Sequence, residues 1–272
     1  MTQAMDRLAL LGIPNDDNSS YLQGPSEAPD PIRRELHNDA YSMWSESGFD
    51  LGEPGRLLDH GNIQFQADQD PWKLIETAVG KALEPGHPLI CLGGDHAITY
   101  PIMRAVRRRH PSLTILHIDA HADIYHAYQD NPRSHASPFA RIMEEQLTDR
   151  LIQVGLRTIC DEHREQFKRF GVEVIEAGRW SECMQLDFQT PVYISLDIDG
   201  IDPAFAPGVS HREPGGPSTR QVIDLIHSIR QPIVAADIVE YNPRCDLSDQ
   251  TVLVAAKLLK EIGGMMLKNR GR

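Results

Sequence analysis

Carboxylate and imidazole side chains, which can hold metal ions, are concentrated in three short motifs of this sequence. The motifs are GGDH at 93–96, DAHAD at 119–123 and DIDGIDP at 197–203, and each directly follows a short apolar run. Alternate residues of an extended segment point to the same side, so the two-residue spacing within the motifs groups their acidic and histidine side chains. The candidate ligands are His96, Asp119, His121, Asp123, Asp197 and Asp199.

This residue set predicts a pair of divalent cations. Placing several carboxylates so close together costs Coulomb energy unless cations neutralise them. Two imidazoles and four carboxylates, with no thiolate, favour manganese over zinc or copper. Six ligands are too many for one small ion that keeps an open position, but they suit two ions bridged by carboxylates and a water. Two cations that share a water lower its pKa, so such a site can supply hydroxide near neutral pH.

Each motif taken alone is weak evidence for a metal site. A lone DxD is usually a loop or helix-cap pair, and a lone histidine after a strand is usually structural. Asp202 and Pro203 are more typical of a turn than of a metal ligand. Asp95 either caps the following helix or orients a metal ligand. The three motifs together, each directly after an apolar run, favour a metal site over these structural interpretations.

The segments between the motifs predict an α/β fold. Strands are expected where short apolar runs occur, at 8–13, 88–92, 113–118, 151–154, 172–175, 192–196 and 233–236. Helices are expected where the periodicity is helical, at 72–83, 98–109, 137–146, 162–170, 219–228 and 250–266. This alternation is typical of a parallel sheet covered on both faces, where ligands bind at the carboxyl ends of the strands. Segments 14–31 and 204–217 read as long loops.

Composition narrows the class of protein. The chain has 272 residues and a formal net charge of −12, which argues against nucleic acid as a partner. Its four cysteines show no CxxC spacing, which favours reduced thiols and a cytoplasmic location. No signal-peptide pattern precedes the first apolar run, and no stretch reaches the ~20 apolar residues of a membrane span.

The motifs resemble the signature segments of the ureohydrolases, the family of arginase, agmatinase and formiminoglutamase. The resemblance is carried by GGDHAITYP, HIDAHADIY and SLDIDGIDPAFAPG, and by SHASPFARI, PGVSHREPGG and DIVEYNP further along. The sequences of these segments are most similar to those of plant-type arginases and bacterial agmatinases. Residues 1–84 match more loosely, for example through LLGIP at 10–14.

The resemblance implies a single domain over residues 1–272, with a three-layer αβα fold and an eight-stranded, mainly parallel sheet. It implies two Mn²⁺ ions per chain that share two bridging carboxylates, and a homotrimer or homohexamer. One ion is expected on His96, Asp119, Asp123 and Asp197. The other is expected on Asp119, His121, Asp197 and Asp199.

Three residues have implied catalytic roles. His135 falls at the family's histidine outside the metal shell, where it can shuttle protons because its reference pKa is near 6.5. Glu240 falls at the carboxylate that receives a guanidinium, and a carboxylate can accept two parallel N–H bonds from that group. Asp123 is expected to pass a proton to the leaving amine.

The substrate's tail must be selected by the loops at 15–31 and 124–134. In the second loop, Asn131 and Arg133 could donate hydrogen bonds to the α-carboxylate of arginine, whereas Asp130 would suit agmatine. Tyr125 stands where animal arginases have an asparagine, so their tail contacts do not transfer. We expect a small guanidino substrate, with arginine favoured over agmatine. The alternatives are a formiminoglutamase, a non-catalytic family member and, more remotely, a histone-deacetylase-like deacylase.

Overall fold

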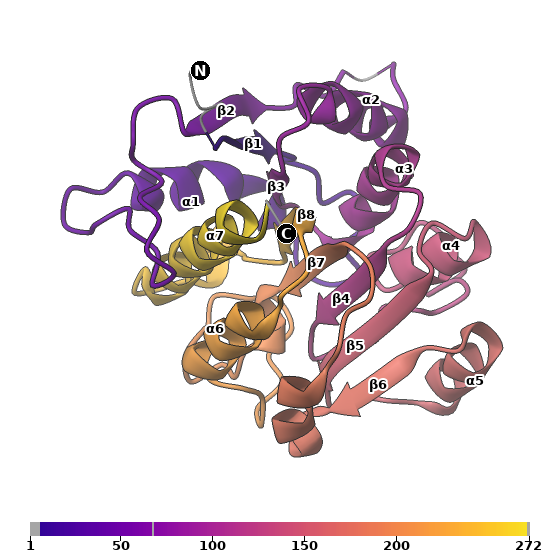
Figure 1. Ribbon diagram of the computed structural model, residues 1–272. Helices are drawn as coiled ribbons and strands as arrows, with labels where there is room; N and C mark the ends of the chain where they lie inside the picture. The colour runs from indigo at the N-terminus through magenta and orange to yellow at the C-terminus, as the bar shows by residue number, and fades with distance from the viewer. Residues whose placement is uncertain (1–5, 67, 271–272) are drawn as a thin grey trace.

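The three motifs follow strands of one eight-stranded sheet (Figure 1). The computed structural model describes residues 6–66 and 68–270. The strand order is β2-β1-β3-β8-β7-β4-β5-β6, and every neighbouring pair is parallel. The strands are β1 (Leu8–Gly12), β2 (Leu57–Asn62), β3 (Leu89–Leu92), β4 (Thr114–Ile118), β5 (Arg150–Leu156), β6 (Glu173–Glu176), β7 (Val192–Asp197) and β8 (Ile233–Val239).

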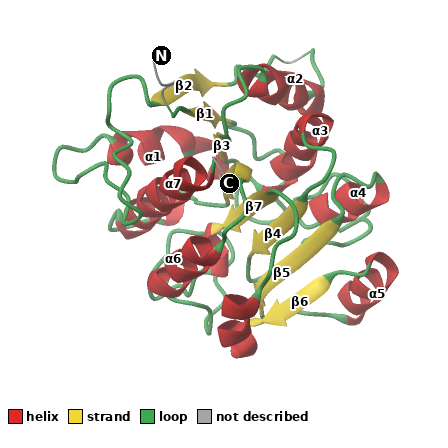
Figure 2. Ribbon diagram, in the orientation of Figure 1, coloured by secondary structure: helices red, strands yellow, loops and turns green. Residues whose placement is uncertain are grey.

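Helices cover both faces of the sheet, which confirms the predicted three layers (Figure 2). One face carries α1 (Pro29–Leu36), α6 (Thr219–Ser228) and α7 (Gln250–Asn269). The other carries α2 (Pro71–Leu83), α3 (Thr99–Arg109), α4 (Pro138–Glu144) and α5 (Asp161–Phe170). Short 3-10 turns complete the chain: η1 (Pro25–Glu27), η2 (His96–Ile98), η3 (Ala177–Gln185), η4 (Ile198–Gly200) and η5 (Pro243–Cys245).

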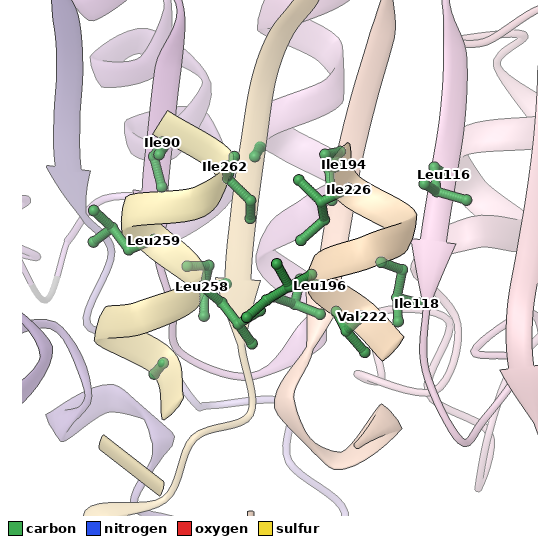
Figure 3. Close-up of a cluster of buried hydrophobic side chains, with 14 of the residues drawn as sticks. Ile90, Leu116, Ile118, Ile194, Leu196, Val222, Ile226, Leu258, Leu259 and Ile262 are labelled. Carbon is green, nitrogen blue, oxygen red and sulfur yellow. The ribbon is translucent and has the colours of Figure 1, made fainter. Parts of the chain in front are cut away.

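The core fixes the strand ends that carry the motifs. On one face, side chains of α6 and α7 pack on the central strands (Figure 3). Leu196 and Ile118 are wholly buried there, and each directly precedes a motif aspartate. Full burial of such a side chain stabilises a fold by about 1.5–3 kcal/mol. A shift of either strand would expose this face, so the packing also holds the acidic residues that follow.

Two elements differ from the sequence prediction. The edge strand β2 was not predicted, because in LLDHGN only the two leucines are apolar and its central residues are exposed. Helix α1 starts inside the predicted loop 14–31, whose proline content favoured a loop. Proline is well tolerated in the first helical turn, where its missing N–H would be unpaired anyway. Among the described helices, none combines the length and apolarity that a membrane crossing needs.

Candidate metal centre and pocket

The three motifs follow the carboxyl ends of β3, β4 and β7, strands of the same parallel sheet (Figure 1). Their side chains come together there, and Glu240, which follows β8, contacts the backbone of His96. Glycines allow this close approach. A Cβ atom at Gly94 would lie 1.8 Å from the carbonyl oxygen of Asn15. A Cβ atom at Gly200 would lie 2.7 Å from the Cα atom of Asp119. The close packing at Gly94 and Gly200 therefore leaves no space for a side chain, which explains why the GGDH and DIDG motifs contain glycine at these positions.

The first cluster forms around the imidazole of His96. Its Nδ1 atom lies 3.3 Å from Asp119 Oδ2, 3.0 Å from Asp123 Oδ2 and 3.1 Å from Asp197 Oδ2. All four side chains are buried, and their ligand atoms lie within 4.8 Å of one another. Asp123 adopts φ of 46°, a strained value for a non-glycine residue, which fits a position held by the site.

The hydrogen bonds of His96 identify Nε2 as a protonated ring nitrogen and leave Nδ1 facing the carboxylates. Ser195 Oγ donates to Asp237 Oδ1 at 2.7 Å, so its single hydrogen is engaged. The His96 Nε2 atom, 3.0 Å from the same Oγ, must then be the protonated ring nitrogen. In the neutral ring, Nδ1 is unprotonated, and it is a buried polar atom without a hydrogen-bond partner. A cation bound at this point would balance the three carboxylates, so these residues fit a metal ion.

The second cluster consists of Asp119, His121 and Asp199. His121 Nδ1 lies 3.4 Å from Asp119 Oδ1 and 3.2 Å from Asp199 Oδ2. Asp199 Oδ1 is buried without a hydrogen-bond partner. Asp119 thus belongs to both clusters. Asp197, the second residue expected to bridge, is grouped with the first cluster only, and its Oδ1 atom accepts the backbone N–H of Asp199 at 2.7 Å.

The electrostatics of the cluster also favour bound cations. Burial and the neighbouring carboxylates raise the pKa of Asp197 well above its usual range. Burial is also the main cause that raises the pKa of Asp199, to about 7, although His121 opposes the shift. The ionised forms of both carboxyls are therefore costly without a cation, and divalent ions would remove that cost.

His135 and Glu240 form a buried pair next to the clusters. The His135 Nδ1 atom donates to Glu240 Oε1 at 2.8 Å, and its Nε2 atom lies 2.8 Å from Ser20 Oγ. The same Glu240 oxygen accepts the backbone N–H of His96 at 2.9 Å. Burial opposes protonation of His135, but the Glu240 carboxylate outweighs it and raises the pKa of His135 to about 9. Glu240 adopts φ of 62°, a second strained backbone value at the site.

Asp95 anchors the long loop that follows β1. Its Oδ1 atom accepts the backbone N–H of Ala97, which caps the turn after His96. Its Oδ2 atom accepts the backbone N–H of Asn18 at 2.9 Å, and the carbonyl of Asn18 accepts the N–H of His135 at 3.1 Å. Asp95 is therefore a helix cap that also positions the segment carrying Ser20, rather than a metal ligand.

A pocket of about 210 Å³ opens onto both clusters. It is lined by residues of the second and third motifs, together with His135 and Glu240. The lining also includes several residues that the sequence did not single out as contacts. They are Ser20, Tyr128, Thr158, His163 and Glu213, with Tyr125 and His211 beside them. His211 comes from segment 204–217, where the sequence left open whether it lines the mouth of the site or is solvated in a loop; in the structure it lines the pocket.

The proposed tail-binding residues Asn131 and Arg133 are not on the pocket wall. The Arg133 guanidinium lies 4.6 Å from the centre of the Trp72 ring, and its Nη1 atom lies 3.4 Å from Asp70 Oδ1. The Asn131 side chain accepts the backbone N–H of Arg133 at 2.9 Å. The loop therefore turns both side chains outward. This geometry does not support the contact predicted for them, which was inferred from their place in the loop at 124–134 and from their ability to donate hydrogen bonds.

Comparison with known proteins agrees with this geometry. The model of the arginase family matches residues 6–264. "Arginase 1, mitochondrial" of Oryza sativa subsp. indica is 44% identical, with 95% of this chain and 81% of that protein covered. "Agmatinase" of Bacillus anthracis is 32% identical, with 94% and 90% covered.

The fold comparison gives the same result. The structure of "Arginase from Medicago truncatula" superposes with a TM-score of 0.91 at 38% identity, covering 96% of this chain and 88% of that one. The eight-stranded sheet with helices on both faces is thus the fold of that relative. The chain belongs to the arginase family, and it is a ureohydrolase, a hydrolase that acts on the C–N bonds of linear amidines.

Proposed function

We propose that the protein is a binuclear manganese amidinohydrolase that releases urea from arginine. The observation that carries the proposal is the pair of His/Asp clusters, which share Asp119 and open onto one pocket. The first ion would be held by His96, Asp119, Asp123 and Asp197. The second would be held by Asp119, His121 and Asp199, with Asp197 as the remaining candidate. Nitrogen and oxygen ligands without a thiolate suit manganese.

When bound, two such ions supply a water of lowered pKa and polarise the group to be attacked. The protein's own residues must then hold the guanidinium. Glu240 Oε1 already accepts hydrogen bonds from His96 and His135, so Oε2 is the oxygen left for a guanidinium N–H. A charge-assisted bond of this kind would fix the orientation of the scissile end.

The hydrogen-bonded pair of His135 and Glu240 can support proton transfer. Because Glu240 raises the pKa of His135 to about 9, the imidazole carries a proton at neutral pH. Its Nε2 atom contacts Ser20 Oγ, and both side chains line the pocket. We assign His135 to giving a proton to the leaving amine through this side, with Asp123 as the partner that faces the first cluster.

The preference for arginine is supported by the relatives named arginase, which share more identity with this chain than those named agmatinase. The described pocket wall contains neither Lys nor Arg, so an α-carboxylate would have to be met by hydroxyl and imidazole groups such as those of Tyr128, Thr158 and His163. Agmatine, which has only an amine tail, is the second candidate, because Glu213 lies on the same wall.

The test measures kcat/KM after manganese loading, as urea release from arginine and agmatine and as formamide release from formiminoglutamate. A clear preference for agmatine would replace arginine by the second candidate. Release of formamide from formiminoglutamate, without urea from any guanidine, would assign the site to the third branch of the family. We also propose a homo-oligomer, trimeric or hexameric, which light scattering of the purified protein would test.

A further inference from the structure

His117 is a buried histidine that the reaction described above does not use. It lies on β4, two residues before Asp119, and is wholly inaccessible to solvent. Its ring packs 4.0 Å from that of Phe139 and 4.9 Å from that of His96, measured between ring centres. Its Nε2 atom lies 2.7 Å from Asp119 Oδ2. A buried imidazole in contact with the carboxylate shared by both clusters must either orient that carboxylate or bind metal itself.

The neighbouring glutamine determines which ring nitrogen of His117 carries the proton. Gln153 Nε2 lies 2.6 Å from the carbonyl oxygen of Ala122 and 3.0 Å from His117 Nδ1. A flipped amide would bring two oxygens together at Ala122, so the amide nitrogen must face both partners. It donates one hydrogen to each. His117 Nδ1 is therefore an acceptor, and Nε2 is the protonated nitrogen that donates to Asp119.

The hydrogen bonds on Asp119 then leave each of its oxygens one free direction. Oδ2 accepts from His117, and Oδ1 accepts the backbone N–H of His121 at 2.7 Å. Oδ2 faces His96 in the first cluster, and Oδ1 faces the His121 ring in the second. With one lone pair on each oxygen engaged, Asp119 is oriented to give one oxygen to each cluster.

We infer that Gln153 and His117 form a positioning relay that holds Asp119 as the bridge between two metal ions. The inference rests on the proposed metal centre, and it makes His117 a donor to a ligand rather than a ligand. Hydrogen bonds that orient a ligating carboxylate typically change metal affinity by about 10–100-fold when they are removed.

The rival interpretation is that His117 binds an ion directly, because His96, His117 and Asp119 also place ligand atoms within 4.8 Å of one another. Direct binding through Nε2 would need the proton on Nδ1. That proton would then face the Gln153 amide hydrogens, and the carbonyl of Ala122 prevents the amide from turning. The arrangement of Gln153 therefore favours the relay.

Three substitutions separate the two interpretations. His117→Phe removes the donor but retains an aromatic ring against Phe139. His117→Gln returns an N–H group near the position of Nε2. Gln153→Met removes the amide hydrogens that fix the tautomer and leaves both Asp119 and His117 in place. Ile152→Val, a buried change next to Gln153, serves as the matched control for packing, and the free energy of unfolding of the metal-free protein is measured for all variants.

The main readout is manganese binding, followed by the EPR signals of free and spin-coupled Mn²⁺ during titration. The relay predicts that His117→Phe weakens binding about 10–100-fold, that Gln153→Met weakens it in the same direction, and that His117→Gln recovers most of the loss. Ile152→Val should match wild type. Unchanged affinity in both His117→Phe and Gln153→Met would overturn the relay. Loss of one ion per chain in both His117 variants, with Gln153→Met normal, would identify a metal ligand instead.

A second readout does not depend on metal or activity. The ¹⁵N shifts of the His117 ring in the metal-free wild-type protein should show a protonated Nε2 and an unprotonated Nδ1. The opposite tautomer would contradict the relay directly, even if His117→Phe does not fold. If the relay is confirmed and no guanidine yields urea, the proposed function fails while this inference stands.

Discussion

The Nδ1 atom of His135 donates to the Glu240 carboxylate at 2.8 Å, although the two residues are 105 positions apart in sequence. Both side chains are buried and line the pocket. The bond joins the loop after β4 to the turn after β8. The proton donor and the guanidinium-binding group proposed for the reaction thus form one unit, so a change at either residue should affect the other.

Replacing His135 should reduce turnover without removing metal. His135→Asn keeps a polar side chain at the pocket but cannot carry the proton. We expect kcat to fall roughly 10–10⁴-fold, which spans the scale of acid–base catalysis, while manganese content is retained. Steady-state kinetics and elemental analysis of the same preparation check this. Loss of metal with normal turnover at saturating manganese would show that the role of His135 is wrong.

The same pair predicts a pH dependence of stability. Because Glu240 raises the pKa of His135 from 6.5 to about 9, the pair stabilises the fold fully below pH 6.5 and loses that contribution as pH rises through 9. The difference in unfolding free energy between wild type and His135→Asn should therefore shrink from pH 6.5 to 9.5. Urea denaturation of the metal-free proteins across this range measures it. A difference independent of pH would contradict the assigned ion pair.

Removing a carboxylate from the first cluster should have opposite effects with and without metal. Burial and repulsion make the ionised form of Asp197 costly. Metal-free Asp197→Asn should therefore be at least as stable as wild type. Manganese should raise the melting temperature of wild type, by linkage worth about 2.7 kcal/mol at 100 times Kd, and should raise that of the variant less, because the first cluster has lost a ligand. Glu165→Gln, at an exposed position, is the control. An equal manganese-induced rise in both proteins would exclude Asp197 as a ligand.

Arg133 should matter little for substrate binding, because its guanidinium stacks on Trp72 outside the pocket. Its exposed ion pair with Asp70 is of a kind worth about 0–1 kcal/mol. We expect Arg133→Ala to change kcat/KM for arginine less than about 3-fold. His163→Leu, which alters the pocket wall, should change KM more. A selective loss of arginine turnover in Arg133→Ala would restore the contact suggested by the sequence.

Arg157 should contribute to the stability of the site through backbone contacts. Its guanidinium donates to the carbonyl oxygens of Glu213, Gly155, Gly200 and Asp199 at 2.8–3.0 Å. Lysine keeps the positive charge, but its ammonium group cannot donate to all four of these carbonyl oxygens. Arg157→Lys should lower the unfolding free energy by roughly 2–4 kcal/mol, because buried carbonyls lose charged donors. Denaturant unfolding checks the value, and a change below 0.5 kcal/mol, the usual scale of a surface substitution, would contradict it.

Much of the fold could be predicted because the central strands are buried on both faces and read as apolar runs. The grouping of the candidate ligands could be predicted because each motif directly follows such a run, and a parallel sheet brings those ends together. The edge strand β2 could not be predicted, because its solvent-exposed residues are polar and leave no continuous apolar run. Helix α1 could not, because Pro-Asp-Pro starts a helix as readily as a turn.

The pocket wall was the least predictable part of the site. Ser20 reaches His135 only because Asp95 holds the segment around Asn18, which is a contact across 77 positions. Arg133 points away because Trp72 and Asp70 lie outside the pocket, and no local pattern in 124–134 reveals them. From the sequence, His117 is only a residue of the strand predicted at 113–118. Its proposed role depends on hydrogen bonds to Asp119 and Gln153, which only the structure shows.

The most direct test of the account is urea release by a single preparation assayed with arginine and agmatine, as purified, after exhaustive chelation and after manganese is returned. Elemental analysis accompanies each state. The account predicts two Mn²⁺ per chain, a higher kcat/KM for arginine than for agmatine, loss of urea release on chelation and recovery with manganese. Full activity in the chelated protein, or no urea from either substrate with two ions bound, would contradict it.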